Sequence, residues 1–425
     1  MMSEIDAPSA LSSPQRRCQT LLMLSLPGQE ITHQYISNVN NVDGDTARLD
    51  IADINNELQR YHRLTIVTHH DGCYRIEGTP LDQRLCLLHW LRRALRLCPA
   101  FISHHYTPAL KSQLKLAGIA RTLYDDTNLQ ALINRCARGL HRQFECRDLH
   151  FLRLYLQYCL LQHHHGLTPS FNAAQQNWTE ARIEHQVAEE IVRHWQRRIH
   201  QLPHEDEHRF LTLLFMMLRT PDPVHDGHLH DRRLQLAISR LIERFQGMTG
   251  REFSDEQGLR DQLYIHLSQA LNRSIFSIGI DNSLPEEINY LYPRLMRTTR
   301  IALHEFEEDF GIRFTEEESG LVAVIFGAWL MQESELHEKQ VLLLTDDNPN
   351  LENELERQLR ELTLLPINIK NQSVRDFQKE GAPKGVALVV TPYAVTLPLF
   401  SPPLIHARDL LSEHQRQQIC KMLET

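Results

Sequence analysis

Residues 152–162, LRLYLQYCLLQ, and residues 263–273, LYIHLSQALNR, decide the fold of this 425-residue chain, because the second segment repeats the first. A further pair follows downstream, FLTLLF at 210–215 and LVAVIF at 321–326, and each member comes shortly after two acidic residues. Apolar residues at helical spacing predict helices for these segments. The chain therefore contains a duplicated helical unit.

The internal spacing of the two copies is identical. Tyr155 and Leu214 in the first copy are 59 residues apart, and so are His266 and Ile325 in the second. Equal spacing in two copies indicates one structural unit that occurs twice.

We predict an all-helical domain for each copy, at 127–223 and at 231–335. Pro221-Asp222-Pro223 marks the linker between them, because two prolines and an aspartate disfavour a continuous helix. Domains of about 100 residues are an ordinary size for an independent core.

Upstream of the repeats, residues 1–80 carry the pattern of a winged helix-turn-helix. Two short helices precede a third at about 43–61, and the strands 64–68 and 73–76 alternate around a turn. In such a domain the third helix enters the DNA major groove, which makes Thr46 and Arg48 candidate DNA contacts.

The charge of this third helix works against DNA binding. Residues 43–61 hold five acidic residues and two arginines, and phosphate contacts supply most non-specific DNA affinity. A winged helix that has become a structural or protein-binding unit is therefore the alternative.

Residues 81–126 follow as a basic helical segment. From 75 to 121 there are eight Lys and Arg residues against two acidic ones. The stretch 114–126 is typical of a helix, a glycine-containing turn and a helix, so one interpretation is a second helix-turn-helix with Arg121 as a DNA contact. The other is a solvated basic helical linker.

The last ninety residues, 336–425, predict a small α/β domain around a mostly parallel sheet. Strands are expected at 341–344, 367–369 and 386–390, and helices at 351–362 and 411–423.

Bulk composition excludes several classes of protein. The net charge of −9 argues against a wholly basic nucleic-acid coat protein, and the uncharged stretches 319–332 and 385–407 are too short or too proline-rich for a membrane helix. The eight scattered cysteines indicate a reducing cytosol, so we expect a cytoplasmic protein. The 25 histidines include runs at 163–165 and 225–230, but consecutive helix positions point in different directions, and we predict no metal site.

The second copy resembles the phosphotransferase regulation domain (PRD) of sugar-operon antiterminators and activators. The resemblance rests on Gln262 to His266, Leu291-Tyr292-Pro293 and the acidic pair before 321–326. It implies two PRD bundles that pair as a homodimer and exchange phosphate with phosphotransferase-system proteins through histidines.

Only one of the four acceptor positions implied by the resemblance holds a histidine. His266 stands at the first position of the second copy, and Ile325 at the second; in the first copy these positions hold Tyr155 and Leu214. His266 is therefore the candidate phosphoacceptor.

The C-terminal domain resembles the B component of sugar permeases. In that component a cysteine after the first strand carries phosphate, whereas the corresponding loop here, residues 345–349, has no cysteine and two aspartates. The resemblance thus implies a permease-B-like domain without its chemistry.

Taken together, the sequence predicts a mainly α, multidomain, non-enzymatic regulatory protein without a cofactor. The leading hypothesis is a transcription-regulator-like function linked to carbon or growth state, with DNA and phosphotransferase proteins as candidate partners. A protein-binding scaffold that has lost DNA binding and phosphorylation is the alternative, and a metal- or pH-sensing module is a third hypothesis. No G-x-S-x-G, Walker-type, H-E-x-x-H or G-x-G-x-x-G motif supports an enzyme.

Overall fold

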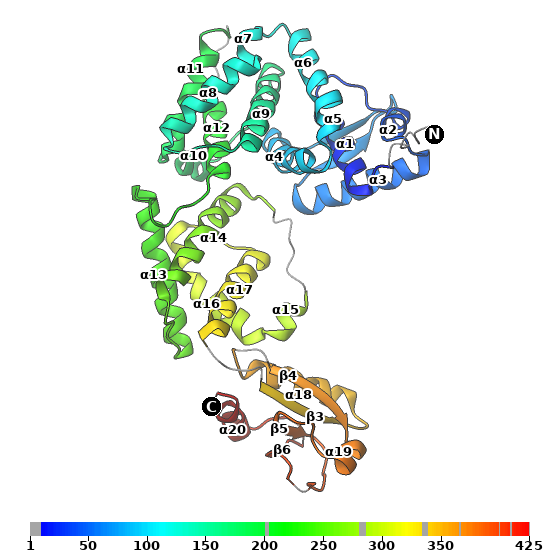
Figure 1. The fold of residues 1–425 in the computed structure, drawn as a ribbon, viewed down its shortest axis with the longest axis vertical. Helices are drawn as coiled ribbons and strands as arrows, with labels where there is room; N and C mark the ends of the chain where they lie inside the picture. The colour runs from blue at the N-terminus through cyan, green and yellow to red at the C-terminus, as the bar shows by residue number, and fades with distance from the viewer. Residues whose placement is uncertain are drawn as a thin grey trace, which may run out of the picture. The chain divides into compact units, whose positions relative to one another are not determined.

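The computed structural model describes residues 10–199, 204–279, 286–333, 339–364, 367–398, 400–408 and 410–424. The chain divides into two compact units, one of residues 1–219 with 275–281 and one of residues 220–274 with 282–425. The predicted domain boundary at 335/336 lies outside the described residues. Most of the described chain is helical, as the sequence predicts (Figure 1).

Unit 1 begins with three helices and a hairpin where the sequence places them. The elements are α1 (Ser13–Ser25), α2 (His33–Asn40), α3 (Gly44–Tyr61), β1 (Thr65–Thr68) and β2 (Tyr74–Glu77). The strands are antiparallel, with Thr65 opposite Glu77. Pro14 lies in the first turn of α1, and the Asp43 side chain accepts the Thr46 N–H at the start of α3, so local capping sets these helix starts.

The basic segment that follows is helical but irregular. It consists of α4 (Pro80–Leu97), α5 (Pro99–Phe101), a π-helical turn (Ile102–Tyr106), α6 (Thr107–Leu116) and α7 (Arg121–Tyr124). The helix after the turn at Gly118 is thus a single turn, because Asp125 is extended and caps the next helix. This is shorter than a groove-reading helix, which weakens the interpretation of a second helix-turn-helix.

The first repeat shares its core with these N-terminal helices. It comprises α8 (Asp126–Gly139), α9 (Cys146–His164), α10 (Ala173–Glu180), α11 (Ile183–Gln196) and α12 (Glu205–Leu218). One continuous set of buried apolar residues runs from Cys18 in α1 to Phe215 in α12. Helix α9 packs against α4, α6 and α8, and every residue from Phe151 to Gln162 except Arg153 is buried, so this part of the helix is enclosed on all sides.

The second repeat lies in unit 2 except for the end of its second helix, since the chain from Ile275 belongs to unit 1 and Phe276 packs in the core of that unit. Its helices are α13 (Leu229–Thr249), α14 (Glu256–Phe276), α15 (Glu286–Leu291), α16 (Pro293–Phe310) and α17 (Glu316–Glu333). The rings of Phe245 and Phe326 stack at 4.0 Å between α13 and α17.

The C-terminal region is a four-stranded parallel sheet of order β4-β3-β5-β6 with helices, as the sequence predicts for an α/β region. Helix α19 and strand β6 are additions to the prediction. The elements are β3 (Lys339–Thr345), α18 (Pro349–Glu361), β4 (Ile367–Ser373), α19 (Val374–Glu380), β5 (Val386–Thr391), β6 (Leu404–His406) and α20 (Glu413–Glu424). Val341 and Leu343 pack on one face of the sheet and Leu342 and Leu344 on the other, which explains the unbroken apolar run of β3.

Candidate functional site

Each repeat has a buried glutamate at the same place, in the first turn of its last helix. Glu207 lies in α12 and Glu318 in α17, and the two positions correspond in the sequence repeat. A carboxylate in a first helical turn is favoured by the helix dipole, but a buried one also needs a cationic partner. The two repeats supply that partner in different ways.

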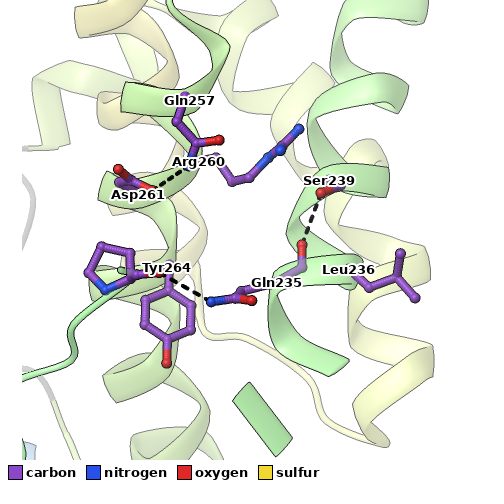
Figure 2. Close-up of a pocket in the computed structure, with 8 residues that line it drawn as sticks. Gln235, Leu236, Ser239, Gln257, Arg260, Asp261 and Tyr264 are labelled. Carbon is purple, nitrogen blue, oxygen red and sulfur yellow. Dashed lines mark hydrogen bonds between the residues drawn. The ribbon is translucent and has the colours of Figure 1, made fainter. Parts of the chain in front are cut away.

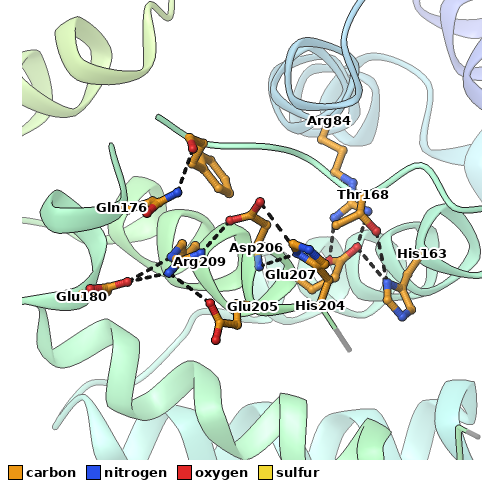
Figure 3. Close-up of polar contacts among 11 residues, drawn as sticks. Arg84, His163, Thr168, Gln176, Glu180, His204, Glu205, Asp206, Glu207 and Arg209 are labelled. Carbon is orange, nitrogen blue, oxygen red and sulfur yellow. Dashed lines mark hydrogen bonds and ion pairs between the residues drawn. The ribbon is translucent and has the colours of Figure 1, made fainter. Parts of the chain in front are cut away.

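In the first repeat the partner comes from outside the repeat. Arg84 of α4 donates from Nη1 to Glu207 Oε2 at 2.8 Å and from Nη2 to Glu207 Oε1 at 2.6 Å (Figure 3). The two side chains are 1% and 0% exposed. Arg84 Nη2 also donates to the Leu167 carbonyl at 3.0 Å, and its guanidinium lies 4.9 Å from the Phe210 ring centre. The pair is bidentate and almost fully buried, the strongest geometry for such a contact.

Two more side chains of α9 complete this site. Tyr155 donates its hydroxyl to the Arg84 carbonyl, and His163 Nδ1 lies 3.2 Å from Glu207 Oε1. Burial raises the pKa of Glu207, but Arg84 and His163 outweigh it and hold the pKa below its usual value. The carboxylate is therefore ionised at neutral pH, and the site is a network of charges that contact one another.

In the second repeat the arginine comes from the repeat itself. Arg273 of α14 donates from Nη2 to Glu318 Oε2 at 3.2 Å and also pairs through Nε. His266 Nε2 lies 3.5 Å from the same carboxylate, which is 4% exposed beside the 18% exposed histidine. Burial raises the pKa of Glu318, whereas His266 and Arg273 lower it further, so the pKa lies below the usual value. His266, Glu318 and Arg273 thus form a half-open site.

The acceptor positions implied by the resemblance are also more deeply buried in the first repeat than in the second. Tyr155 and Leu214 are fully buried in the first repeat, while His266 and Ile325 are half-buried in the second. The sequence therefore locates His266 in a site. It shows the acidic pairs as part of the repeat, but it does not reveal that Glu207 and Glu318 organise the sites, since their arginines lie at unrelated positions.

The third N-terminal helix is less acidic in its setting than its residue count suggests. One of the five carboxylates caps the helix and the other four pair with arginines. Three of these arginines come from other helices. The partners are, in chain order, Asp43 with the Thr46 N–H, Asp45 with Arg48, Asp50 with Arg16, Asp53 with Arg17 and Glu57 with Arg93. The net charge counted within this helix therefore overstates its repulsion of phosphate.

The candidate DNA contacts do not form one cluster. Thr46 is half-buried and donates its hydroxyl to Asp43, and exposed Arg48 pairs with Asp45 at 2.8 Å. Arg121 is exposed on α7, which lies away from α3 within unit 1 (Figure 1).

The loop after the first strand of the C-terminal sheet is occupied by a carboxylate of the chain. Glu352 Oε1 accepts the Asp346 N–H at 2.7 Å and the Tyr393 hydroxyl at 2.7 Å, and Tyr393 accepts the Asn348 N–H at 2.9 Å. These backbone donors at the start of α18 are the groups that would bind a phosphate. The loop contains no cysteine, and its Asp346 and Asn348 N–H groups are already hydrogen-bonded within the chain.

A separate pocket of about 370 Å³ lies between α13, α14 and Pro223 (Figure 2). Its polar side chains bond mainly to neighbours, with Gln257 donating to Asp261 at 2.7 Å and Ser239 to the Gln235 carbonyl at 3.0 Å. His266 is not among the lining residues.

Within the described residues, no group of three or more His, Cys, Asp or Glu side chains is arranged to hold a metal ion. Within the same ranges, no helix has both the length and the apolar character that a membrane crossing requires.

Comparison with known proteins gives the family. Over all 425 residues, and over the full length of both chains, the sequence is 60% identical to the stationary phase-inducible protein CsiE of Escherichia coli (strain K12). The chain belongs to the CsiE family. Residues 339–423 match the C-terminal domain of stationary phase-inducible protein CsiE, and residues 130–217 and 239–329 match the PRD domain.

These matches confirm the resemblance to PRD-containing regulators that the repeat suggests. The CsiE-family chain is also 24% identical over 212 residues to the transcriptional regulator ManR of Bacillus subtilis (strain 168), covering 47% of this chain and 33% of ManR. The PRD matches contain both buried glutamates, which places the two contrasting sites within one duplicated domain.

Proposed function

We propose that the chain is a non-enzymatic, transcription-regulator-like protein, linked to carbon or growth state, whose second PRD receives phosphate on His266. The observation that carries the proposal is the half-open cluster of His266, Glu318 and Arg273. Phosphotransferase-system proteins are the proposed donors, by analogy with the PRD domain that the sequence matches.

The geometry around His266 supports Nδ1 as the proposed acceptor atom. Its Nε2 is buried and faces Glu318, so the ionised carboxylate favours the tautomer with the proton on Nε2. Nδ1 then keeps a lone pair and is the nucleophile. A phosphoryl group would add about two negative charges beside Glu318, which gives a physical reason for a rearrangement.

The second repeat also offers the surface for the proposed homodimer. Ile265 and Val324, which precede His266 and Ile325 in the sequence, are 45% and 41% exposed. Leu154 and Leu213 at the corresponding places in the first repeat are buried. A second copy that covers the open face would bring the phosphate-sensitive residue close to the dimer contact.

For the N-terminal region we propose a winged helix-turn-helix formed by α1, α2, α3 and the β1–β2 hairpin. Arginines from α1 and α4 neutralise three of the acids on α3, which lowers the repulsion between this helix and DNA phosphates. The alternative function, a protein-binding scaffold, is favoured by the engagement of Thr46 and Arg48 with acids of α3 and its cap. Salt-sensitive retention of the purified protein on genomic DNA supports the regulator, and no retention at low salt supports the scaffold.

Phosphate transfer tests the role of His266. The full chain is incubated with the general phosphocarrier system, and the mass shift is located by peptide mass spectrometry. We expect a shift on the peptide that contains His266, which His266→Gln removes and His304→Gln retains, because His304 is an exposed histidine paired with a glutamate at 3.4 Å but lies outside the cluster. Equal labelling of that peptide in both variants contradicts the assignment.

A further inference from the structure

The first repeat has rebuilt a histidine–glutamate–arginine cluster from other positions. Glu207 contacts His163 at 3.2 Å and Arg84 at 2.6 Å, whereas Glu318 contacts His266 and Arg273. His163 lies about two helical turns after Tyr155 on α9, so it is not at either position that the resemblance marks as an acceptor. The glutamate thus has a histidine partner in both repeats, although the sequence repeat shows one only in the second.

The contacts of His163 determine which nitrogen is reactive. Glu207 is ionised and can only accept a hydrogen bond, so the nitrogen that faces it, Nδ1, carries the proton. Thr168 Oγ1 lies 3.4 Å from the same nitrogen. The lone pair is then on Nε2, on the other side of the ring, in an imidazole that a carboxylate orients and whose developing positive charge it stabilises.

Access to His163 is comparable with access to His266. The two side chains are 11% and 18% exposed, and each lies beside a glutamate that is almost fully buried. His163 belongs to the run 163–165 at the end of α9, where His164 and His165 are exposed. Exposure alone therefore favours the neighbours, whereas the carboxylate contact favours His163.

We propose that His163 is a second phosphoacceptor of this chain and takes the phosphoryl group on Nε2. The proposal rests on the proposed function, because it assumes the same donor, a phosphohistidine protein. In the transfer the Nε2–P bond forms while the donor N–P bond breaks, and its electron pair returns to the donor nitrogen. Nδ1 keeps its proton toward Glu207, and no oxidation or reduction takes place.

The position of His163 gives such a modification a direct link to the N-terminal helices. Glu207 joins His163 to Arg84, and Arg84 also holds the Leu167 carbonyl, next to Thr168. A change of charge at His163 thus acts on the contact that holds α4. In the second repeat the arginine is local, so the same modification would act within α14 and α17.

The test uses the full chain carrying His266→Gln, with phosphoramidate as a small-molecule phosphodonor and the phosphocarrier system as the protein donor. We expect phosphoramidate to label His163 on Nε2 several-fold faster than His164 or His165, with the isomer identified by nitrogen-specific antibodies or NMR. His163→Gln should remove the label, and His164→Gln should leave it; circular dichroism checks that both variants fold.

The outcomes separate this proposal from the proposed function. Phosphoramidate labelling that follows exposure, with His164 and His165 modified and His163 unmodified, overturns the proposal, as does labelling of His163 on Nδ1. With the protein donor acting on the wild-type chain, label on His266 alone overturns the proposal and leaves the proposed function intact. Label on neither histidine overturns both.

Discussion

The two repeats bury the same glutamate but neutralise it from different parts of the chain. In the first repeat, Arg84 of α4 reaches Glu207 in a fully buried bidentate pair; in the second, Arg273 of α14 reaches Glu318 in a half-open one. The first repeat is therefore joined to the N-terminal helices by both a charge pair and a common core, whereas the second repeat supplies the arginine of its pair itself. One copy of the duplicated domain is thus anchored to the N-terminal helices, whereas the other neutralises its glutamate from within.

The C-terminal region repeats the pattern of the first repeat. In the loop after β3, Glu352 accepts the Asp346 N–H and the Tyr393 hydroxyl, and Tyr393 accepts the Asn348 N–H. In both places groups of the same molecule engage a carboxylate. In the second repeat, His266 beside Glu318 is 18% exposed, against 11% for His163 beside Glu207.

The largest expected effect comes from Arg84→Met. Removing one partner of a buried ion pair leaves Glu207 uncompensated, and we expect a loss of about 3–5 kcal/mol in the free energy of unfolding. Arg84→Met with Glu207→Met should recover most of it, since apolar residues of similar size can replace such a pair. Urea unfolding in a Trp329→Phe background measures this, because the remaining tryptophans, Trp90, Trp178 and Trp195, lie in unit 1. A double variant as unstable as the single one would contradict the claim that Arg84 stabilises the first repeat by neutralising Glu207.

Acidification should produce the next largest effect. The folded-state pKa of Glu207 lies below its unfolded value near 4.5, so its contribution is present above about pH 4.5 and is lost as the pH falls through the folded pKa. Protonation then leaves the Arg84 cation buried against a neutral acid. We expect the urea midpoint of unit 1 to fall between pH 5 and pH 3 in the wild type. The fall should be smaller in the Arg84→Met, Glu207→Met double variant, and equal slopes would contradict the assignment.

Arg273→Met should have a smaller effect than Arg84→Met. Its side chain is 20% exposed, so water partly compensates Glu318 once the arginine is gone. We expect a loss of about 1–2 kcal/mol, between the values for exposed and buried pairs. Local hydrogen exchange in α14 and α17 measures it. A loss as large as that of Arg84→Met would remove the proposed distinction between the repeats.

Tyr155→Phe should have the smallest effect of the series. It removes the hydroxyl that donates to the Arg84 carbonyl but keeps the buried ring, and we expect a loss of about 0.5–1.5 kcal/mol. Urea unfolding in the Trp329→Phe background, followed by tryptophan fluorescence, detects the change in the urea midpoint. A neutral result would show that Tyr155 fills space without holding α4.

The elements of this fold were predictable where local signals are strong. The spacing of apolar residues located α3 and the paired helices of the repeats, and the apolar run of β3 located the parallel sheet. Strand β6 has only three residues and follows two prolines, so its pairing with β5 depends on the sheet already being formed. The length of helix α7 was not predictable from its own residues, because the helix ends at Tyr124, where Asp125 caps the next helix.

The sites were less predictable than the elements. His266 could be located from the resemblance, but Arg84 and Glu207 are 123 residues apart and no local pattern joins them. The excess of histidines also gave no indication that His163 rather than its two neighbours would face a carboxylate. The effective charge of α3 is likewise less negative than its own residues indicate, because Arg16, Arg17 and Arg93, which pair with its acids, come from other helices. Such contacts belong to tertiary structure, and the sequence alone does not specify them.

Hydrogen exchange followed by mass spectrometry on full-length Arg84→Met and Arg273→Met tests most directly whether the first repeat is the anchor of the N-terminal helices. Cooperative units that share a core lose protection together. For Arg84→Met we predict faster exchange in α1 and α4 as well as in α9 and α12, and for Arg273→Met faster exchange confined to α14 and α17. Faster exchange in Arg84→Met that is limited to α12, with α1 and α4 unchanged, would contradict the anchor.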